Sequence, residues 1–193
     1  MQLNINSKGN SALLIIDMIN SLDFTEGALL LKQMETIIEP IQLLSAQMRA
    51  SRCPVIYVND NQGRWQSDKQ ELIARALDGP ASDFVRLLLP APSDYFIIKP
   101  KHSGFFATPL QALLTSLNVG TLILCGVAGN ICVLFTANDA YMRDYQLIVP
   151  EDCCASNVRA DNRYALRMMA HVLQADTRPY QESVVCTPFI GKE

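Results

Sequence analysis

The chain has 193 residues, of which 49% are hydrophobic and 18% charged, and its formal net charge is -3 at pH 7. This length suits one domain, and we expect a single domain over residues 1–193. Lys and Arg are scattered, and no apolar segment approaches the ~20 residues that span a bilayer, so we expect neither nucleic acid nor membrane as a partner. The polar stretch 1–9 lacks the apolar core of a secretory signal, which predicts a cytoplasmic protein.

Apolar runs alternate with helical patterns along the chain. Runs rich in Val, Ile, Leu and Tyr predict strands near 12–16, 54–58, 95–98, 121–125, 146–149 and 183–186. Helical patterns occupy 33–50, 66–77, 107–117, 131–143 and 156–173, the last with Ser156 or Asn157 as N-cap, and 78–94 is predicted as a turn, a short helix and a turn. Because the strands are continuously apolar, they predict a parallel sheet covered on both faces, hence a three-layer α/β/α domain.

Three of the apolar runs are followed by a side chain with useful chemistry. Asp17 follows the run 12–16, Lys99 follows the run 95–98, and Cys132 follows the run 122–126. Taken singly, they have structural explanations: a turn cap, a solvated lysine and a buried thiol. Ligands of open α/β sheets bind beyond the carboxyl ends of the strands, so the three together predict a nucleophilic site at that edge.

The segment GVAGNICV (126–133) joins an apolar strand to a helix. A thiol in the first turn of a helix faces unpaired backbone N–H groups and the positive end of the helix dipole, and both favour the thiolate. The glycines here match neither G-x-G-x-x-G nor a P-loop. They therefore indicate a tight turn that presents Cys132, and neither a dinucleotide site nor a phosphate site.

Three ordered motifs carry a resemblance to a known family. They are LIIDMIN (14–20), IKPKHSGFFATPL (98–110) and GVAGNICV (126–133), the last continuing to Asp139-Ala140. In this order and spacing the chain resembles the isochorismatase-like cysteine hydrolases, which include nicotinamidases and N-carbamoylsarcosine amidase. The resemblance covers nearly the whole chain. It implies a Rossmann-like fold with a six-stranded parallel sheet in the order 3-2-1-4-5-6.

The same resemblance implies a catalytic triad of Asp17, Lys99 and Cys132. Lys101 is the alternative lysine, but Lys99 directly follows the apolar strand, as the family's lysine does. A cis peptide between Val127 and Ala128 is also implied, together with an oxyanion hole formed by the backbone N–H groups of Ala128 and Cys132. The implied reaction is hydrolysis of an amide, urea or carbamoyl C–N bond in a small molecule through a thioester on the cysteine.

Metal and cofactor binding are not expected. Nicotinamidases hold a metal with an Asp and two histidines after the second strand, whereas here Asp60 has no histidine near it. The two histidines of the chain, His102 and His171, lack metal-ligand spacing, and so do the six cysteines, which we interpret as reduced thiols.

Substrate contacts are predicted around the same edge of the sheet. The residues are Leu22, Asn59, Asp60, Asn61, Trp65, Phe105 and Phe106, and of the two adjacent phenylalanines one is expected in the core and the other in the pocket. A homo-oligomer, a dimer or larger, is also expected. Two alternatives stay open: a catalytically silent binding or assembly protein on the same scaffold, and an isochorismatase-type hydrolase of a non-amide substrate.

Overall fold

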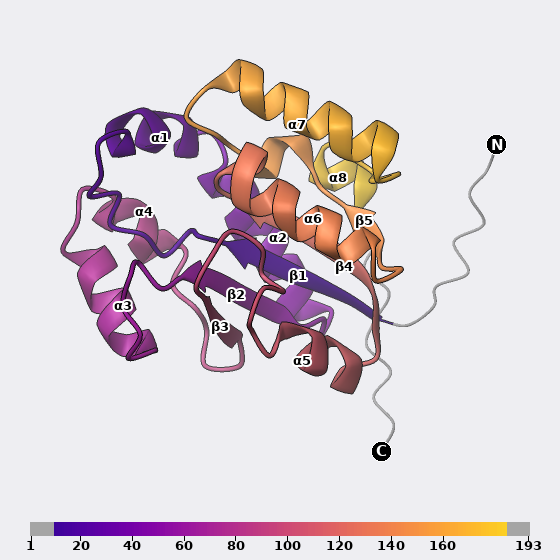
Figure 1. Ribbon diagram of the computed structural model, residues 1–193, viewed down its shortest axis with the longest axis horizontal. Helices are drawn as coiled ribbons and strands as arrows, with labels where there is room; N and C mark the ends of the chain where they lie inside the picture. The colour runs from indigo at the N-terminus through magenta and orange to yellow at the C-terminus, as the bar shows by residue number, and fades with distance from the viewer. Residues whose placement is uncertain (1–9, 185–193) are drawn as a thin grey trace.

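Five parallel strands form the centre of the protein in the order β3-β2-β1-β4-β5 (Figure 1). They are β1 (Asn10–Ile16), β2 (Val55–Asp60), β3 (Tyr95–Lys99), β4 (Val119–Gly126) and β5 (Gln146–Ile148). This computed structural model describes residues 10–184. The first five predicted strands and their order are therefore confirmed.

The predicted sixth strand, near 183–186, is not among the strands of the described residues. Ser183 belongs to the short helix α8 (Tyr180–Ser183), and residues from 185 onward lie outside the described residues. The chain instead meets the edge of β5 earlier, where Asp176 forms an isolated parallel bridge with Ile148. The sheet of residues 10–184 thus has five strands, and the fold class stands as predicted.

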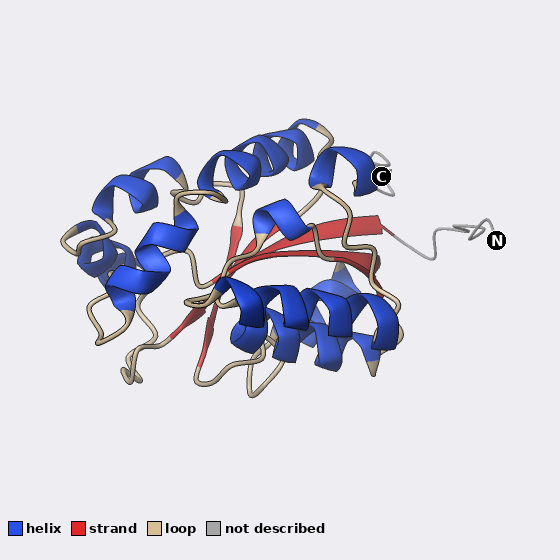
Figure 2. Cartoon of the chain, turned by 90° about the horizontal axis from the view of Figure 1, so that it is seen from above, coloured by secondary structure: helices blue, strands red, loops and turns tan. Residues whose placement is uncertain are grey.

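Helices cover both faces of the sheet (Figure 2). They are α1 (Gly27–Met34), α2 (Ile38–Ala50), α3 (Lys69–Leu77), α4 (Ser82–Leu87), α5 (Leu110–Ser116), α6 (Leu134–Tyr141), α7 (Arg159–Val172) and α8. Successive residues of β1 enter opposite cores: Leu13 and Ile15 pack toward α1 to α4 and α8, while Leu14 and Ile16 pack toward α5, α6 and α7. A strand buried on both faces explains the continuous apolar run.

Several helix boundaries differ from the predicted ones. The pattern 33–50 was expected to form one helix, but a turn at 35–37 separates α1 from α2. Helix α7 begins at Arg159, and Ser156 does not cap it, because its hydroxyl binds elsewhere. The segment 78–94 contains the short helix α4, as predicted. Within residues 10–184, no helix combines the length and hydropathy needed to cross a membrane.

The register of the strands brings their carboxyl ends together. Ile16 pairs with Val58 on one side and with Gly126 on the other. Further out, Asp60 pairs with Lys99. The residues that directly follow these positions therefore emerge at one edge of the sheet, which is where ligands of open α/β sheets bind.

Candidate active site

Lys99 lies between a carboxylate and a thiol at this edge of the sheet. Its Nζ donates a hydrogen bond to Asp17 Oδ2 at 2.9 Å and another to Cys132 Sγ at 3.5 Å. The lysine side chain is 0% exposed, so its charge is neutralised by these neighbours and not by water. The structure thus brings together the three residues that the sequence proposed as a triad.

Asp17 is the first residue beyond β1, and its backbone leaves the strand conformation there. It has a φ of 54°, in the left-handed region that side chains other than glycine seldom adopt. Its amide donates to Val58 O at 3.0 Å, and its Oδ1 accepts from the Asp60 N–H at 2.7 Å. Burial raises the pKa of the Asp17 carboxyl, although Lys99 opposes the shift. A carboxylate with a raised pKa is suited to accept a proton.

The choice of Lys99 over Lys101 agrees with their burial, since Lys101 is exposed whereas Lys99 ends β3 inside the protein. Burial alone would lower the pKa of Lys99. The carboxylate of Asp17, with Cys132 and Asp60, more than offsets that penalty, and the pKa of Lys99 is raised. Lys99 therefore stays protonated across the neutral range.

Cys132 lies in a π-helical turn, Gly129–Val133, that leads into α6. Burial raises the pKa of the Cys132 thiol to about 12, and the nearby Asp17 carboxylate adds to the rise while Lys99 opposes it. Burial and Asp17 outweigh Lys99, so the thiolate expected from the position at a helix start is not the resting form. Activation requires that a base remove the proton.

The turn before Cys132 contains the implied cis peptide and is held by side chains that the sequence did not point to as part of the site. The peptide bond between Val127 and Ala128 is cis. Gly129 N–H donates to Ala155 O at 2.7 Å, and Asn130 N–H donates to Ser156 Oγ at 3.1 Å. The side chain of Asn162, on α7, connects the far side of this network, as it accepts from Ser156 Oγ at 3.0 Å and donates to Cys154 O at 2.9 Å. Ser156 shortly precedes α7 and Asn162 lies on it, so a hydroxyl and an amide six residues apart were the signal that the sequence offered.

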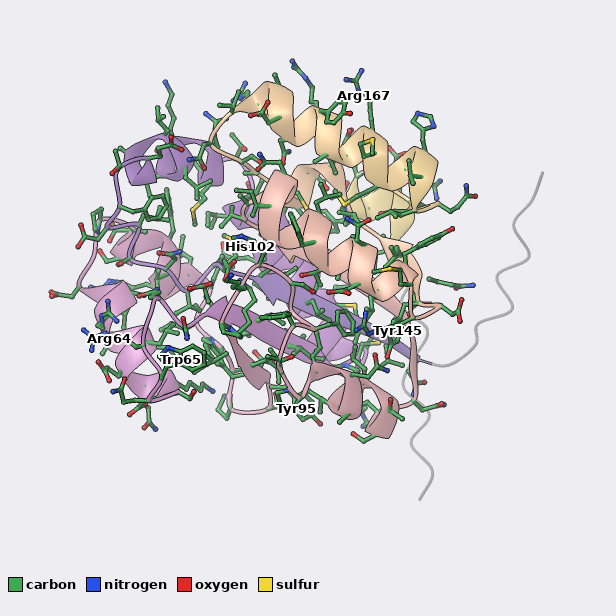
Figure 3. All side chains as sticks on the ribbon, in the orientation of Figure 1. Arg64, Trp65, Tyr95, His102, Tyr145 and Arg167 are labelled. Atoms are coloured by element: carbon green, nitrogen blue, oxygen red, sulfur yellow. The ribbon has the colours of Figure 1, made fainter. Side chains whose placement is uncertain are left out.

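Thr136 joins the cysteine helix to the loop that follows Lys99. Its fully buried hydroxyl donates to Cys132 O at 2.7 Å and accepts from Gly104 N–H at 3.0 Å. This loop passes in front of the sheet beside α6, and it carries His102, whose ring lies 5.4 Å from that of Phe135 (Figure 3). One hydroxyl thereby fixes the backbone of the cysteine relative to the 103–106 loop.

Comparison with known proteins assigns this arrangement to a family. Residues 11–177 match the family model described as the isochorismatase domain. The chain belongs to the isochorismatase family. It is 48% identical over 170 residues to the uncharacterized isochorismatase family protein YaaI of Bacillus subtilis, covering 88% of this chain and 94% of that one. The family expected from the motifs is thus confirmed, and the chain is an isochorismatase-family hydrolase.

Two further relatives have activities in their names. Ureidoacrylate amidohydrolase RutB of Cronobacter turicensis is 29% identical over 172 residues, covering 74% of this chain and 73% of that one. The crystal structure of N-carbamoylsarcosine amidase from Thermoplasma acidophilum superimposes with a TM-score of 0.67 at 26% identity, covering 88% of this chain and 96% of that one. Both names describe enzymes that cleave C–N bonds.

The four apolar residues that are predicted to contact substrate in this isochorismatase-family chain fall into two groups, buried and exposed. Leu22 and Phe105 are packed into the apolar cores on opposite faces of the sheet. By contrast, Trp65 is 77% exposed and Phe106 is 54% exposed. Trp65 lies beside Arg64 in the loop before α3 (Figure 3). Of the two adjacent phenylalanines, Phe105 is the core residue and Phe106 is free to contact a ligand.

The polar members of the predicted set lie at the end of β2. Asn59 is buried and its Nδ2 donates to Ile19 O at 3.0 Å, while its Oδ1 has no partner within residues 10–184. Asn61 is buried too, and its amide donates to Lys99 O at 2.9 Å. Asp60 alone of the three points a charged group toward the triad, since its Oδ2 lies 3.8 Å from Lys99 Nζ.

The segment 55–68, which contains β2 and the loop after it, does not contain the histidines that the resemblance to nicotinamidases would require for a metal. No cluster of three or more His, Cys, Asp or Glu side chains that could hold a metal ion occurs in the part of the chain that the structure describes. Asp60 has the carboxylate but no histidine partners. These residues do not fit such an ion.

Proposed function

We propose that this chain is a cysteine hydrolase that cleaves the C–N bond of a small amide, urea or carbamoyl compound. Cys132 is the nucleophile, Asp17 the proton acceptor and donor, and Lys99 the charge that holds them together. One observation carries the proposal: a buried ammonium group lies 2.9 Å from the carboxylate and 3.5 Å from the sulfur. Such a constellation has few uses other than to activate a thiol.

The first half-reaction forms a thioester. Asp17 takes the thiol proton of Cys132, and its raised pKa suits it to hold that proton. The sulfur attacks the carbonyl carbon, and the negative charge passes to the carbonyl oxygen. The Ala128 N–H has no acceptor within residues 10–184, so it is free to donate to that oxygen, and the Cys132 N–H is the second proposed donor. Asp17 then protonates the departing nitrogen, and the C–N bond breaks.

The second half-reaction removes the acyl group. Asp17, again a carboxylate, accepts a proton from water, and the resulting hydroxide attacks the thioester carbon. The C–S bond breaks, and the proton returns from Asp17 to the Cys132 sulfur. Throughout this cycle Lys99 keeps its proton, because the pKa of its ammonium group is raised by the surrounding negative groups. The products are an acid and ammonia or an amine.

The proposal that the cleaved bond is a C–N bond rests on two relatives and on the chemistry of the Cys132 thiol. RutB and N-carbamoylsarcosine amidase each bear a name that describes C–N cleavage of a ureido or carbamoyl compound. The 3.5 Å hydrogen bond between Lys99 Nζ and Cys132 Sγ supports a role for this sulfur in forming the acyl intermediate that such cleavage needs. An ether substrate would give this sulfur no acyl group to accept, so the amide class is favoured over a non-amide substrate.

The test is ammonia release from a panel of small amides, ureas and carbamoyl compounds. The native chain is expected to release ammonia from at least one class, and Cys132→Ala is expected to release none. Cys53→Ala, which removes another buried cysteine, is the matched control and is expected to keep the activity. A panel without any turnover by the native chain, or turnover that survives Cys132→Ala, would contradict the proposal, and the first outcome would favour a silent binding protein.

A further inference from the structure

Asp60 is a second carboxylate at the site, and the proposed steps do not use it. Its Oδ2 lies 3.8 Å from Lys99 Nζ, and the same ammonium lies 3.5 Å from Cys132 Sγ. The Asp60 side chain is 37% exposed, whereas that of Asp17 is 8% exposed and that of Lys99 is 0% exposed. Of the charged groups around the sulfur, Asp60 is therefore the one that faces incoming molecules.

The Asp60 carboxylate is held in place by its own loop. Its Oδ1 accepts from the Gln62 N–H at 2.7 Å, and its backbone N–H donates to Asp17 Oδ1 at 2.7 Å. The next residue is anchored in turn, because the Asn61 N–H donates to Lys99 O and its Oδ1 accepts from the Gly63 N–H, both at 2.9 Å. With one oxygen engaged by the turn, the other stays directed at Lys99.

The formal charges at the site sum to a negative value. Lys99 contributes one positive charge, Asp17 and Asp60 contribute one negative charge each, and the Cys132 thiol is neutral because its pKa is raised. Moving the thiol proton to Asp17 leaves that sum unchanged, and so does attack on a neutral carbonyl. A substrate with its own anionic group near the reacting carbon would place a second net negative charge beside Asp60 and the buried Asp17–Lys99 pair.

The negative charge of Asp60 is not fully neutralised by Lys99 or Arg64, because each of these cations is paired with another carboxylate. Within residues 10–184, its ion pair is with Lys99, which Asp17 also engages at the shorter distance of 2.9 Å. Arg64, in the same loop, is paired with Glu71. Its side chain lies with Trp65 beside α3 (Figure 3).

We propose that Asp60 determines the charge class of the substrate. It directs the site around the Cys132 thiol toward acyl compounds that are neutral or cationic near the scissile carbonyl and disfavours those with an anionic group there. At a charge separation of roughly 6 Å and an effective dielectric of about 20, the repulsion amounts to about 100-fold in binding. Solvent screening reduces it toward about 10-fold, because the Asp60 side chain is 37% exposed. That Cys132 acts on a substrate rests on the proposed function, whereas the selection by charge is a property of the groups around its sulfur.

The experiment labels Cys132 with three methanethiosulfonate reagents that differ in charge: an ethylammonium, a neutral methyl and an ethylsulfonate compound. Rates are followed by intact mass and divided by the rates with free cysteine, with Cys132→Ala identifying the labelled site. The native chain is expected to react at least about 10-fold faster with the cationic reagent than with the anionic one. In Asp60→Asn, which keeps the acceptor for the Gln62 N–H, the ratio is expected to approach one.

Two controls separate charge from folding. Asp83→Asn removes an equal charge from an exposed position on α4 and is expected to leave the ratio unchanged. Asp60→Glu keeps the charge and is expected to keep most of the preference. Raising the ionic strength from ~0.01 M to ~1 M, which shortens the Debye length from about 30 Å to about 3 Å, is expected to compress the ratio in the native chain without any substitution.

Equal normalised rates for the oppositely charged reagents in the native chain would overturn the proposal, and so would a preference that Asp60→Asn leaves unchanged. Labelling needs no turnover, so its outcome is independent of the proposed function. Charge-selective labelling without hydrolysis of any amide would overturn the function and leave the role of Asp60 intact. Hydrolysis through Cys132, together with equal labelling rates for the oppositely charged reagents, would leave the proposed function intact and overturn the role of Asp60.

Discussion

Lys99 Nζ lies 2.9 Å from Asp17 Oδ2, although the two residues are 82 positions apart in the chain. They meet because β1 and β3 flank β2 in the same parallel sheet, so the carboxyl ends of all three strands face the same way. The pair is buried, and neither charge would be stable there without the other. Cys132 completes the group from the helix that follows β4.

Substitution of Asp17 and Lys99 is expected to shift the acidity of Cys132 in opposite directions. The Asp17 carboxylate contributes to the raised pKa of the thiol, which is about 12, and Lys99 opposes the rise. Asp17→Asn should therefore move the pH profile of iodoacetamide labelling to lower pH, and Lys99→Met should move it to higher pH. At pH 8 a thiol with that pKa is ionised in roughly one molecule in ten thousand, so native labelling should rise steadily from pH 7 to 10.

The same two variants separate thiol acidity from catalysis. Asp17→Asn should lose hydrolysis even though its thiol is more acidic, because the proton acceptor and donor is gone. A native labelling plateau below pH 8, or shifts in the same direction for both variants, would contradict the roles given to these side chains.

Gly126 is expected to be intolerant of a side chain. It has a φ of +112°, and an added Cβ would lie 2.1 Å from the Ile16 carbonyl oxygen in the neighbouring strand. Gly126→Ala should lower the free energy of unfolding by more than about 2 kcal/mol, as measured by urea denaturation. Gly63 is the matched control, because it also has a positive φ, +74°, but nothing lies within 4 Å of its added Cβ. Gly63→Ala should cost only about 1 kcal/mol, and equal costs would contradict the steric explanation.

Thr136 is expected to matter through its hydroxyl more than its shape. Thr136→Val keeps the volume but leaves the Gly104 N–H and the Cys132 carbonyl without their partner. We expect a loss of about 1–3 kcal/mol in the free energy of unfolding, with slower labelling of Cys132. Thr136→Ser keeps the hydroxyl and should restore the labelling rate. If the valine and serine variants label alike, the hydroxyl does not position the cysteine.

Phe105 and Phe106 are expected to behave differently although they are adjacent. Phe105 is packed in the core beside α5 and α6, with the Arg143 guanidinium 4.8 Å from its ring centre, so Phe105→Ala should lower the free energy of unfolding by about 3–5 kcal/mol. Phe106 is 54% exposed, so Phe106→Ala should change stability by less than about 1 kcal/mol. An unchanged KM in Phe106→Ala, for a substrate found in the ammonia assay, would remove Phe106 from the proposed pocket.

Much of this architecture could be predicted from the sequence because it is recorded in local patterns. Continuous apolar runs mark strands buried on both faces: Asp17 directly follows β1, Lys99 is the last residue of β3, and Cys132 lies in the turn that follows β4. Lys99 was preferred over Lys101 on the same local ground, and the burial of its side chain agrees. The homo-oligomer and the cytoplasmic location have no counterpart in the described geometry and stay predictions.

The remainder depends on contacts between distant segments. Ser156 was expected to cap the last long helix, but its hydroxyl instead binds Asn130 and Asn162, which come from either side of it in the chain. The acidity of Cys132 was misjudged for a related reason: the helix start is a local feature, whereas the burial and the Asp17 carboxylate that outweigh it come from tertiary packing. Local propensity cannot supply either kind of information.

The central claim is that the Cys132 sulfur carries the acyl group during turnover. The most direct measurement is acid quenching of the chain during reaction with an amide, urea or carbamoyl substrate, followed by mass analysis of the peptide that contains Cys132. This peptide is expected to gain the mass of the acyl group, hydroxylamine is expected to remove that mass, and Cys132→Ala is expected to show neither adduct nor turnover. Undiminished turnover in Cys132→Ala, or an acyl group on any other residue, would contradict it.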